Sequence, residues 1–150
     1  MHARGAAVIA AVVVVMAPAA LAACGSSSKP LSKAEYIAKA DVICQQTTKR
    51  FVDATKGLRH PSPAQVVDAT RTKLVPLLQS QDKDLAKLDP PVADKAAVRK
   101  FLADLQAATD DISKNTAAFV QARGVSRLAT AASTEAGAYG FKVCAKTGPS

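Results

Sequence analysis

Apolar residues recur at every third or fourth position through four stretches of this 150-residue chain, and this spacing is the strongest constraint on its fold. Residues three and four apart share one face of an α-helix, whereas a half-buried strand needs strict alternation. No alternating stretch of useful length follows the N-terminal apolar run. The pattern predicts an all-α domain, and the short connections favour an antiparallel, up-down-up-down four-helix bundle.

The first expected helix begins at Ser32, because Ser32 and Glu35 have the spacing of a capping box. Gly57 is a plausible stop, and Pro61 prevents any continuation. Cys44 is expected beside the apolar stripe, in the middle of the helix. The stripe comprises Tyr36, Ala40, Ile43, Thr47, Phe51, Ala54 and Leu58.

The second expected helix begins at Ser62, with Pro63 in the first helical position and Gln65 completing another capping box. Pro76 falls inside its apolar stripe. Proline lacks an amide donor, so we expect a kink there, more often a tolerated bend than a functional opening. The stripe comprises Val67, Thr70, Leu74, Leu77 or Leu78, Gln81, Leu85 and Leu88.

Two further helices complete the expected domain. The third follows Asp89, its candidate cap, and runs to Gly124. The fourth covers about residues 126–139, and Gly140 is expected to adopt a left-handed backbone with Phe141 folding back. The third stripe comprises Val98, Leu102, Leu105, Thr109, Ile112, Thr116 and Phe119. The buried candidates of the fourth are Leu128, Ala131, Ala132 and Ala138.

The N-terminus carries a different pattern. A short start with Arg4 precedes an apolar run over residues 6–17, Pro18 interrupts it, and small residues follow up to Cys24. This is the three-part layout of a secretory signal. The apolar stretch falls short of the roughly 20 residues that span a membrane, so a removable signal peptide is the better interpretation.

Leu21-Ala22-Ala23-Cys24 resembles the lipobox of bacterial lipoproteins. The resemblance implies that the thiol of Cys24 receives a diacylglyceryl group and that a peptidase cuts between Ala23 and Cys24. Two acyl chains, at about 0.8 kcal/mol per buried methylene, would hold the protein on the extracytoplasmic face of the cell membrane. The alternative is an ordinary signal peptide cut at Ala20-Leu21-Ala22, which would leave Cys24 near a free terminus.

The expected domain organisation follows from these two patterns. Residues 25–30 form a polar tether, and six residues reach at most about 20 Å, so the domain is expected to sit close to the membrane. The expected parts are the signal peptide (1–23), the lipidated tether (24–31), the four-helix domain (32–146) and the tail (147–150).

The other two cysteines, Cys44 and Cys144, form an even pair in an oxidising compartment, which predicts a disulfide. Bundle geometry agrees: a fourth helix of about 14 residues descends about 21 Å and ends level with Cys44 on the first helix. The rival interpretation is a redox pair of thiols, but no Cys-x-x-Cys spacing or neighbouring base favours it.

Three segments carry a family resemblance: Leu-Ser-Lys-Ala-Glu-Tyr at the start of the first helix, Cys44, and the closing Gly-Phe-Lys-Val-Cys. Together they resemble small actinobacterial lipoproteins and secreted helical proteins of uncharacterised function. The resemblance covers roughly the mature domain by pattern and includes no catalytic motif. It implies the same Cys44–Cys144 pairing and implies no activity.

The chain is basic, with a net charge of +8 that falls to +7 when the signal peptide and Arg4 are removed. Such a surface suits anionic lipid headgroups, acidic cell-wall polymers or an envelope protein, and an exported protein is not expected to bind nucleic acid. A solvated, lysine-rich helical surface explains the overall charge equally well, and it is the commoner explanation for the basic end of the first helix. The basic end of the first helix comprises Lys49, Arg50, Lys56 and Arg59.

Residues suited to chemistry are few. His60 is the only histidine after the signal peptide and is expected in an exposed turn, since a metal site needs more ligands. We expect no enzyme activity, no metal and no cofactor beyond the lipid on Cys24. The acidic clusters, expected on solvated helix faces, are Asp82 with Asp84 and Asp110 with Asp111.

These observations predict a membrane-anchored envelope lipoprotein with a non-catalytic helical domain that serves as a binding or structural module. The alternative is a carrier that holds a small apolar or lipid ligand inside the bundle near Pro76. Alanine-rich faces argue against a carrier, because they let helices approach closely and a ligand pocket usually needs about 300 Å³. A large, dry, apolar cavity would reverse this order. The oligomeric state is left open.

Overall fold

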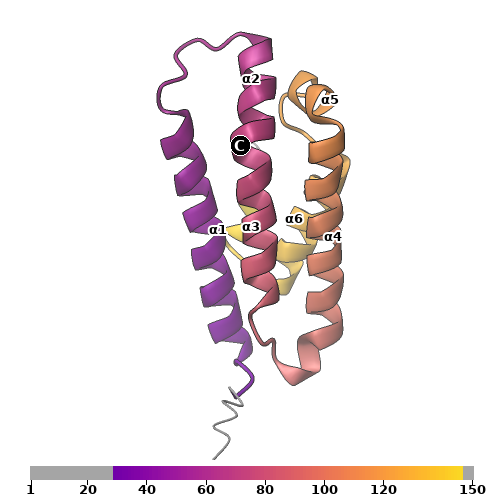
Figure 1. Cartoon of the computed structure of the whole chain (residues 1–150). Helices are drawn as coiled ribbons and strands as arrows, with labels where there is room; N and C mark the ends of the chain where they lie inside the picture. Colours follow the sequence, from indigo (N-terminus) through magenta and orange to yellow (C-terminus); the bar gives the residue numbers. More distant parts are fainter. Residues whose placement is uncertain (1–28, 147–150) are drawn as a thin grey trace, which may run out of the picture.

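The computed structural model describes residues 29–146, and in this range every regular element is a helix (Figure 1). The expectation of an all-α domain is therefore confirmed for these residues. The expected signal peptide, Cys24 and the tail (147–150) lie outside them. No helix between residues 29 and 146 is long and apolar enough to span a membrane.

The helices follow one another with short connections. Figure 1 shows that the three helical segments over residues 63–86 form one continuous column. In chain order the elements are α1 (Lys33–Thr55), α2 (Pro63–Ala69), the π-helix η1 (Thr70–Leu74), α3 (Val75–Ala86), the 3₁₀ turn η2 (Val92–Asp94), α4 (Lys95–Lys114), α5 (Thr116–Gln121), α6 (Arg127–Tyr139) and the 3₁₀ turn η3 (Cys144–Lys146).

Both expected capping boxes are present. The Ser32 hydroxyl accepts the Glu35 amide, and the Glu35 carboxylate accepts the Ser32 amide at 2.9 Å. Ser62 and Gln65 form the same reciprocal pair at the start of α2, with Pro63 in the first turn. Each box satisfies two amides that a helix start leaves without partners.

The kink expected at Pro76 takes the form of a π turn. The Val75 amide donates to the carbonyl of Thr70, five residues back instead of four. Pro76 lacks an amide donor and its ring would collide with the carbonyl four residues earlier. One extra residue in the turn before the proline accommodates both problems, so the column continues as α3.

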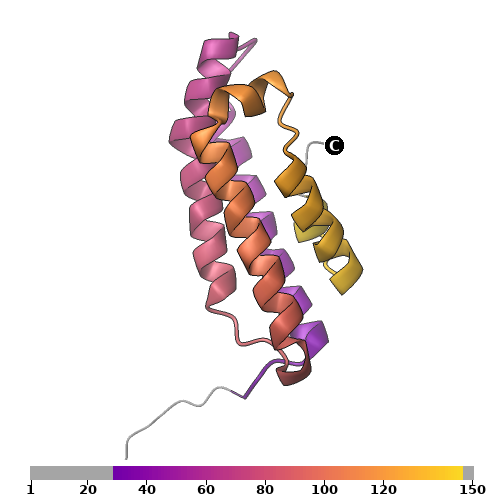
Figure 2. The ribbon, with the colours of Figure 1, turned by 90° about the vertical axis from the view of Figure 1, so that its right-hand side faces the viewer.

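The third helix is shorter than expected at both ends. It begins at Lys95, after the 3₁₀ turn η2, rather than directly after Asp89, so Asp89 does not cap it. It ends at Lys114 rather than near Gly124, and α5 begins after Asn115, whose φ and ψ of −115° and 33° are not helical. The Asn115 side chain donates to the Asp111 carboxylate at 2.8 Å. Such local side-chain bonds compete with the helical pattern, and Figure 2 shows α5 bent across the end of α4.

The end of α6 agrees with the sequence. Gly140 has φ +116°, and the Phe141 amide donates to the carbonyl of Ala136 at 3.0 Å. Only glycine adopts this backbone without steric cost. Phe141 folds back as expected and is 3% exposed.

The buried face of α6 was predicted largely wrongly. Of the expected residues only Ala132 is buried, whereas Leu128 is 36% exposed and Ala131 and Ala138 are also exposed. Ala136, which follows Ala132 by one turn, completes the buried face. Alanine gives a weak periodic signal, so the packing of α6 against α4 and η3 decides which face is covered.

Side-chain packing divides the molecule into two ends. One end, around the start of α1 and the end of α3, holds a core in which the Phe101 and Phe141 rings lie 5.1 Å apart and the Tyr139 and Phe141 rings 5.0 Å apart. Tyr36 packs edge-on against Tyr139 at 6.2 Å. Four of the six aromatic side chains are therefore gathered here, and Phe51 and Phe119 lie elsewhere.

Candidate functional site

The C-terminal segment is fastened to α1 by a disulfide. Cys44 and Cys144 are bonded with their Cα atoms 5.3 Å apart, as the sequence predicts, and both are buried. Cys44 lies within the buried face of α1 rather than beside it. Because the bond joins residues 100 positions apart, it closes nearly the whole domain into one loop.

A second attachment lies one helical turn earlier. The Asp41 carboxylate accepts the amides of Lys142, Val143 and Cys144, at 3.0, 2.9 and 3.1 Å. A carboxylate bound by successive amides makes strong, charge-assisted hydrogen bonds. Together these bonds and the disulfide form a clamp on the C-terminal segment. Nothing in the sequence indicates that Asp41 binds these amides, apart from its position one turn before Cys44.

The other end of the molecule holds a cleft of about 470 Å³ between α1, the α2–η1–α3 column, α5 and η3. The expectation that small core residues leave little cavity space is therefore wrong at this end. Most of the lining is apolar. The lining residues are Thr47, Thr48, Phe51, Val66, Thr70, Leu74, Leu78, Gln81, Phe119, Val120, Arg123, Gly124 and Lys146.

The threonines explain how polar residues can line an apolar cleft. The hydroxyl of Thr47 donates to the carbonyl of Ile43 at 3.2 Å, and that of Thr70 donates to Val66 at 2.8 Å. Each hydroxyl is thus satisfied within its own helix. These side chains are also smaller than the leucines of a packed core, so they leave space where the helices meet.

Gln81 is the polar side chain buried most deeply in the lining. It is 2% exposed, and its Oε1 atom makes no hydrogen bond within residues 29–146. An unpaired buried acceptor costs about 1–3 kcal/mol. The sequence places Gln81 correctly on the buried stripe, but it gives no sign that this side chain borders a cleft.

The charged residues of the lining are two cations, Arg123 and Lys146. Arg123 has φ +55° and Gly124 has φ +76°, and the Gly124 amide donates to the carbonyl of Phe119 at 2.9 Å. This left-handed turn ends α5 and sets Arg123 at the cleft. Lys146 reaches the cleft because the clamp fixes Cys144, two residues before it.

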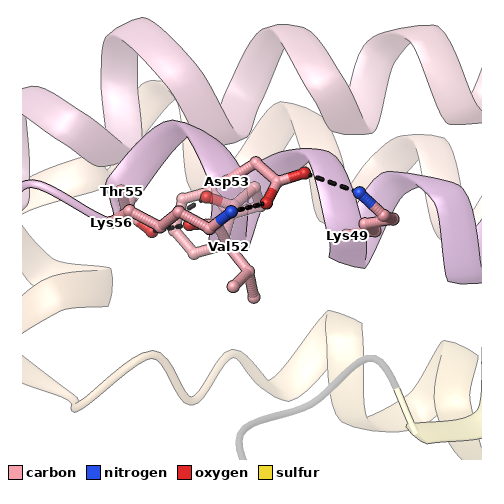
Figure 3. A network of polar contacts seen from close by, with 6 residues as sticks. Lys49, Val52, Asp53, Thr55 and Lys56 are labelled. Carbon is pink, nitrogen blue, oxygen red and sulfur yellow. Dashed lines mark hydrogen bonds and ion pairs between the residues drawn. The ribbon is translucent and has the colours of Figure 1, made fainter.

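The basic end of α1 does not form a concentrated positive site. Asp53 pairs with Lys49 at 2.8 Å and with Lys56 at 2.5 Å, as Figure 3 shows. Hydrogen bonds from Lys49 and then Lys56 lower the pKa of Asp53 to about 2. The carboxylate therefore stays charged and offsets part of the basic character expected here.

The remaining sequence candidates do not converge on a site. His60 is exposed in the turn before α2, with φ +49°. Asp111 is bonded to Asn115 and Ser126, whereas Asp84 pairs with Lys87 at 2.8 Å. Within the described part of the chain, no group of His, Cys, Asp and Glu is arranged to hold a metal ion.

Comparison with known proteins gives no relative: no family model, no curated protein and no solved structure matches this chain. What the cleft can bind therefore follows from its own side chains. Its apolar walls, its buried acceptor on Gln81 and its two cations are suited to binding a small molecule. The lining contains no histidine, cysteine or carboxylate that could act as a nucleophile or base.

Proposed function

We propose that this protein is a membrane-anchored lipoprotein of the cell envelope whose non-catalytic helical domain binds a small apolar or amphiphilic ligand. The cleft of about 470 Å³ is the observation that carries the proposal. Ligand pockets commonly measure about 300–1,000 Å³ and have mostly apolar walls with a few polar groups. This cleft favours the carrier, which the sequence offered as the alternative, over a purely structural module.

The π turn supports the same assignment. Thr70 and Leu74, its first and last residues, both line the cleft. π turns are frequent at functional sites, because the extra residue changes the direction of neighbouring side chains. The expectation placed a ligand near Pro76, and the cleft wall lies just before that residue. Pro76 would then help to shape the site rather than mark only a tolerated bend.

The proposed anchor gives the cleft an orientation. The lipobox would attach the chain at Cys24, close in sequence to the start of α1. Thr47 lies 14 residues beyond Lys33, so the cleft begins about 21 Å farther along the α1 axis. In Figure 1 the start of α1 and the turn before α2 lie at opposite ends of the molecule. We infer that the cleft faces away from the membrane.

The four-helix bundle is part of the proposal. Its members would be α1, the α2–η1–α3 column, α4 and α6. Packing of α1 on α3, α3 on α4, and α4 on α6 supports this order. The clamped C-terminal segment packs against both α1 and α6 and would close the fourth side. In this arrangement α5 is an addition that covers one end.

Binding of a neutral fluorescent apolar probe, N-phenyl-1-naphthylamine, tests the proposed function. The mature chain is used with Cys24→Ser, so that no acyl chain of its own competes. We expect saturable binding with one site per chain. Leu78→Trp and Thr48→Trp should weaken it at least tenfold, because both side chains line the cleft and the larger ring would occupy it.

The matched control is Val92→Trp, which adds the same ring at a side chain that is 69% exposed and outside the cleft lining. It should bind like the parent. Two cleft variants give independent results if Leu78→Trp folds poorly, because Thr48 is more exposed. Absence of saturable binding, or equal binding by all three variants, would remove the carrier proposal.

A further inference from the structure

We propose that the ligand is an anionic amphiphile: an acyl chain that carries a negatively charged head and a hydrogen-bond donor such as an amide. The inference rests on the proposed function and names the ligand class of the same cleft. Three observations carry it: the apolar walls, the two cations and the unpaired Gln81 acceptor.

The apolar part of the ligand fits the walls. The cleft is lined by apolar side chains from three different helices: Phe51 from α1, Leu74 from η1 and Phe119 from α5. These two phenylalanines are the aromatic side chains that the core does not use. An acyl chain between them would be removed from water, which supplies a binding free energy proportional to the apolar area covered.

The charge of the ligand follows from the residues at the cleft. Arg123 and Lys146 are the charged residues in its lining, and no carboxylate of the lining neutralises them. In contrast, Lys49 and Lys56 at the basic end of α1 share Asp53, and Lys100 of α4 is paired with Asp104 and Glu135. A carboxylate or phosphate head would make charge-assisted bonds with the two cleft cations.

The backbone positions both cationic residues at the cleft before any ligand arrives. Arg123 lies in a left-handed turn with Gly124, and Lys146 follows the segment held by Asp41 and the disulfide. Arg123 adopts the left-handed backbone although it is not a glycine. This conformation costs a non-glycine residue about 1–3 kcal/mol and often accompanies a functional position. A backbone that is already in place reduces the cost of ordering the main chain when a ligand binds.

A donor on the ligand would pair with a buried acceptor in the lining. Gln81 is 2% exposed, and its Oε1 atom makes no hydrogen bond within residues 29–146. Because Oε1 is itself buried, a ligand amide or hydroxyl would reach it only when the Gln81 side chain rotates toward the cleft. A simple fatty acid could fill the apolar space and meet the cations, but it would leave this acceptor unpaired, so an N-acyl amino acid is a better match than a fatty acid.

Competition against the naphthylamine probe separates these contributions, again with mature Cys24→Ser protein. N-dodecanoylglycine has charge and donor, its methyl ester has only the donor, and tetradecanoate has only the charge. We expect N-dodecanoylglycine to bind about tenfold more tightly than either of the others, because it makes one additional hydrogen bond or ion pair with the protein.

The variants assign each preference to a residue. Arg123→Gln with Lys146→Gln should remove the preference for acid over ester, measured as the ratio of the two affinities in the same variant. Gln81→Met has a similar shape but no amide acceptor, so it should lower the ratio of the affinity for N-dodecanoylglycine to that for tetradecanoate. Lys49→Gln with Lys56→Gln is the matched control, since it removes two cations outside the cleft lining.

Each outcome has a defined meaning. Equal binding of acid and ester overturns the anionic assignment, although saturable probe binding would still support the carrier. If the Cys24→Ser protein binds neither the probe nor any of the three ligands, the proposed function is overturned as well. Sedimentation of the protein with phosphatidylglycerol vesicles, without probe, distinguishes a free amphiphile from a membrane headgroup: protein that pellets with the vesicles but does not bind N-dodecanoylglycine would contradict the proposal.

Discussion

At the scale of single residues, Asp82 shows how burial acts on a charge: it was expected on a solvated helix face, but the structure places it partly buried. Its side chain borders the groove between α3 and α4, where burial raises its pKa to about 6, the Thr109 hydroxyl opposes this, and Asp110 adds to it. The unfolded pKa is about 3.9, so the folded value is the higher one. The contribution of Asp82 to stability is therefore full below about pH 4 and lost as the pH rises through about 6.

Asp82→Asn should stabilise the domain at neutral pH, because it removes a carboxylate that must ionise in a partly buried position. The raised pKa corresponds to roughly 2–3 kcal/mol, and partial solvent screening reduces the expected gain to about 1–2 kcal/mol at pH 7.5. At pH 4 the gain should be much smaller. Urea unfolding at both pH values measures it, with exposed Asp68→Asn as the control. Equal effects at both pH values would contradict the assignment.

At the scale of elements, the clamp depends on Asp41 as well as the disulfide. Asp41→Asn keeps the shape but removes the negative charge that accepts the amides of Lys142, Val143 and Cys144. Hydrogen exchange at these three amides should therefore accelerate about tenfold or more, since hydrogen bonds to charged groups contribute about 1.5–3 kcal/mol. Asp68→Asn again provides the control. Unchanged exchange would mean that the disulfide alone holds this segment.

The starts of α1 and α2 and the end of α6 were predictable because their signals are local, whereas the third helix begins at Lys95 instead of after Asp89. The capping boxes at Ser32 and Ser62 and the left-handed Gly140 depend on residues within a few positions. The break at Asn115 was missed because one side-chain bond competes there with an otherwise favourable helical pattern. The face of α6 was missed because an alanine-rich helix can bury either side until its partners are known.

The cleft could not be predicted in the same way, because no single segment contains it. The stripes correctly included Thr47, Thr70 and Gln81 among residues that face inward. Periodicity reports which face of a helix is covered, but it does not report whether the covering elements meet closely. Arg123 and Lys146 lie in a turn and at the chain's C-terminal segment, where periodicity carries no information.

At the scale of the whole molecule, the aromatic core and the proposed binding cleft lie at different ends. The core lies around the start of α1, the cleft lies toward the turn before α2, and the disulfide joins α1 at its middle, between the two. Open space reduces packing, so a domain with little aromatic content needs compensation elsewhere. The disulfide is well placed to supply it, because it links the first helix to the last residues of the domain.

Replacing both bonded cysteines, Cys44→Ala with Cys144→Ala, should lower the free energy of unfolding by about 2–5 kcal/mol. The bond closes a loop of 100 residues, for which the chain-entropy model gives up to about 4.7 kcal/mol. Urea unfolding measures the loss. Reduction of the parent protein should reproduce it and have no effect on the double variant. A loss below about 1 kcal/mol would show that the clamp is held mainly by Asp41.

The proposed location of the whole molecule depends on Cys24, and that location would set the ligand concentration at the cleft. If the lipobox is processed as proposed, radiolabelled palmitate should label the wild-type protein in its native host and should not label Cys24→Ser. The wild-type protein should fractionate with membranes, because two acyl chains give stable anchoring whereas one gives only reversible binding. A membrane-bound carrier samples ligands within the reach of its tether, whereas a released carrier samples the medium. Unlabelled wild-type protein found free in the medium would therefore remove the anchor and the outward orientation of the cleft, but it would leave the binding experiments, which use Cys24→Ser, to decide the carrier separately.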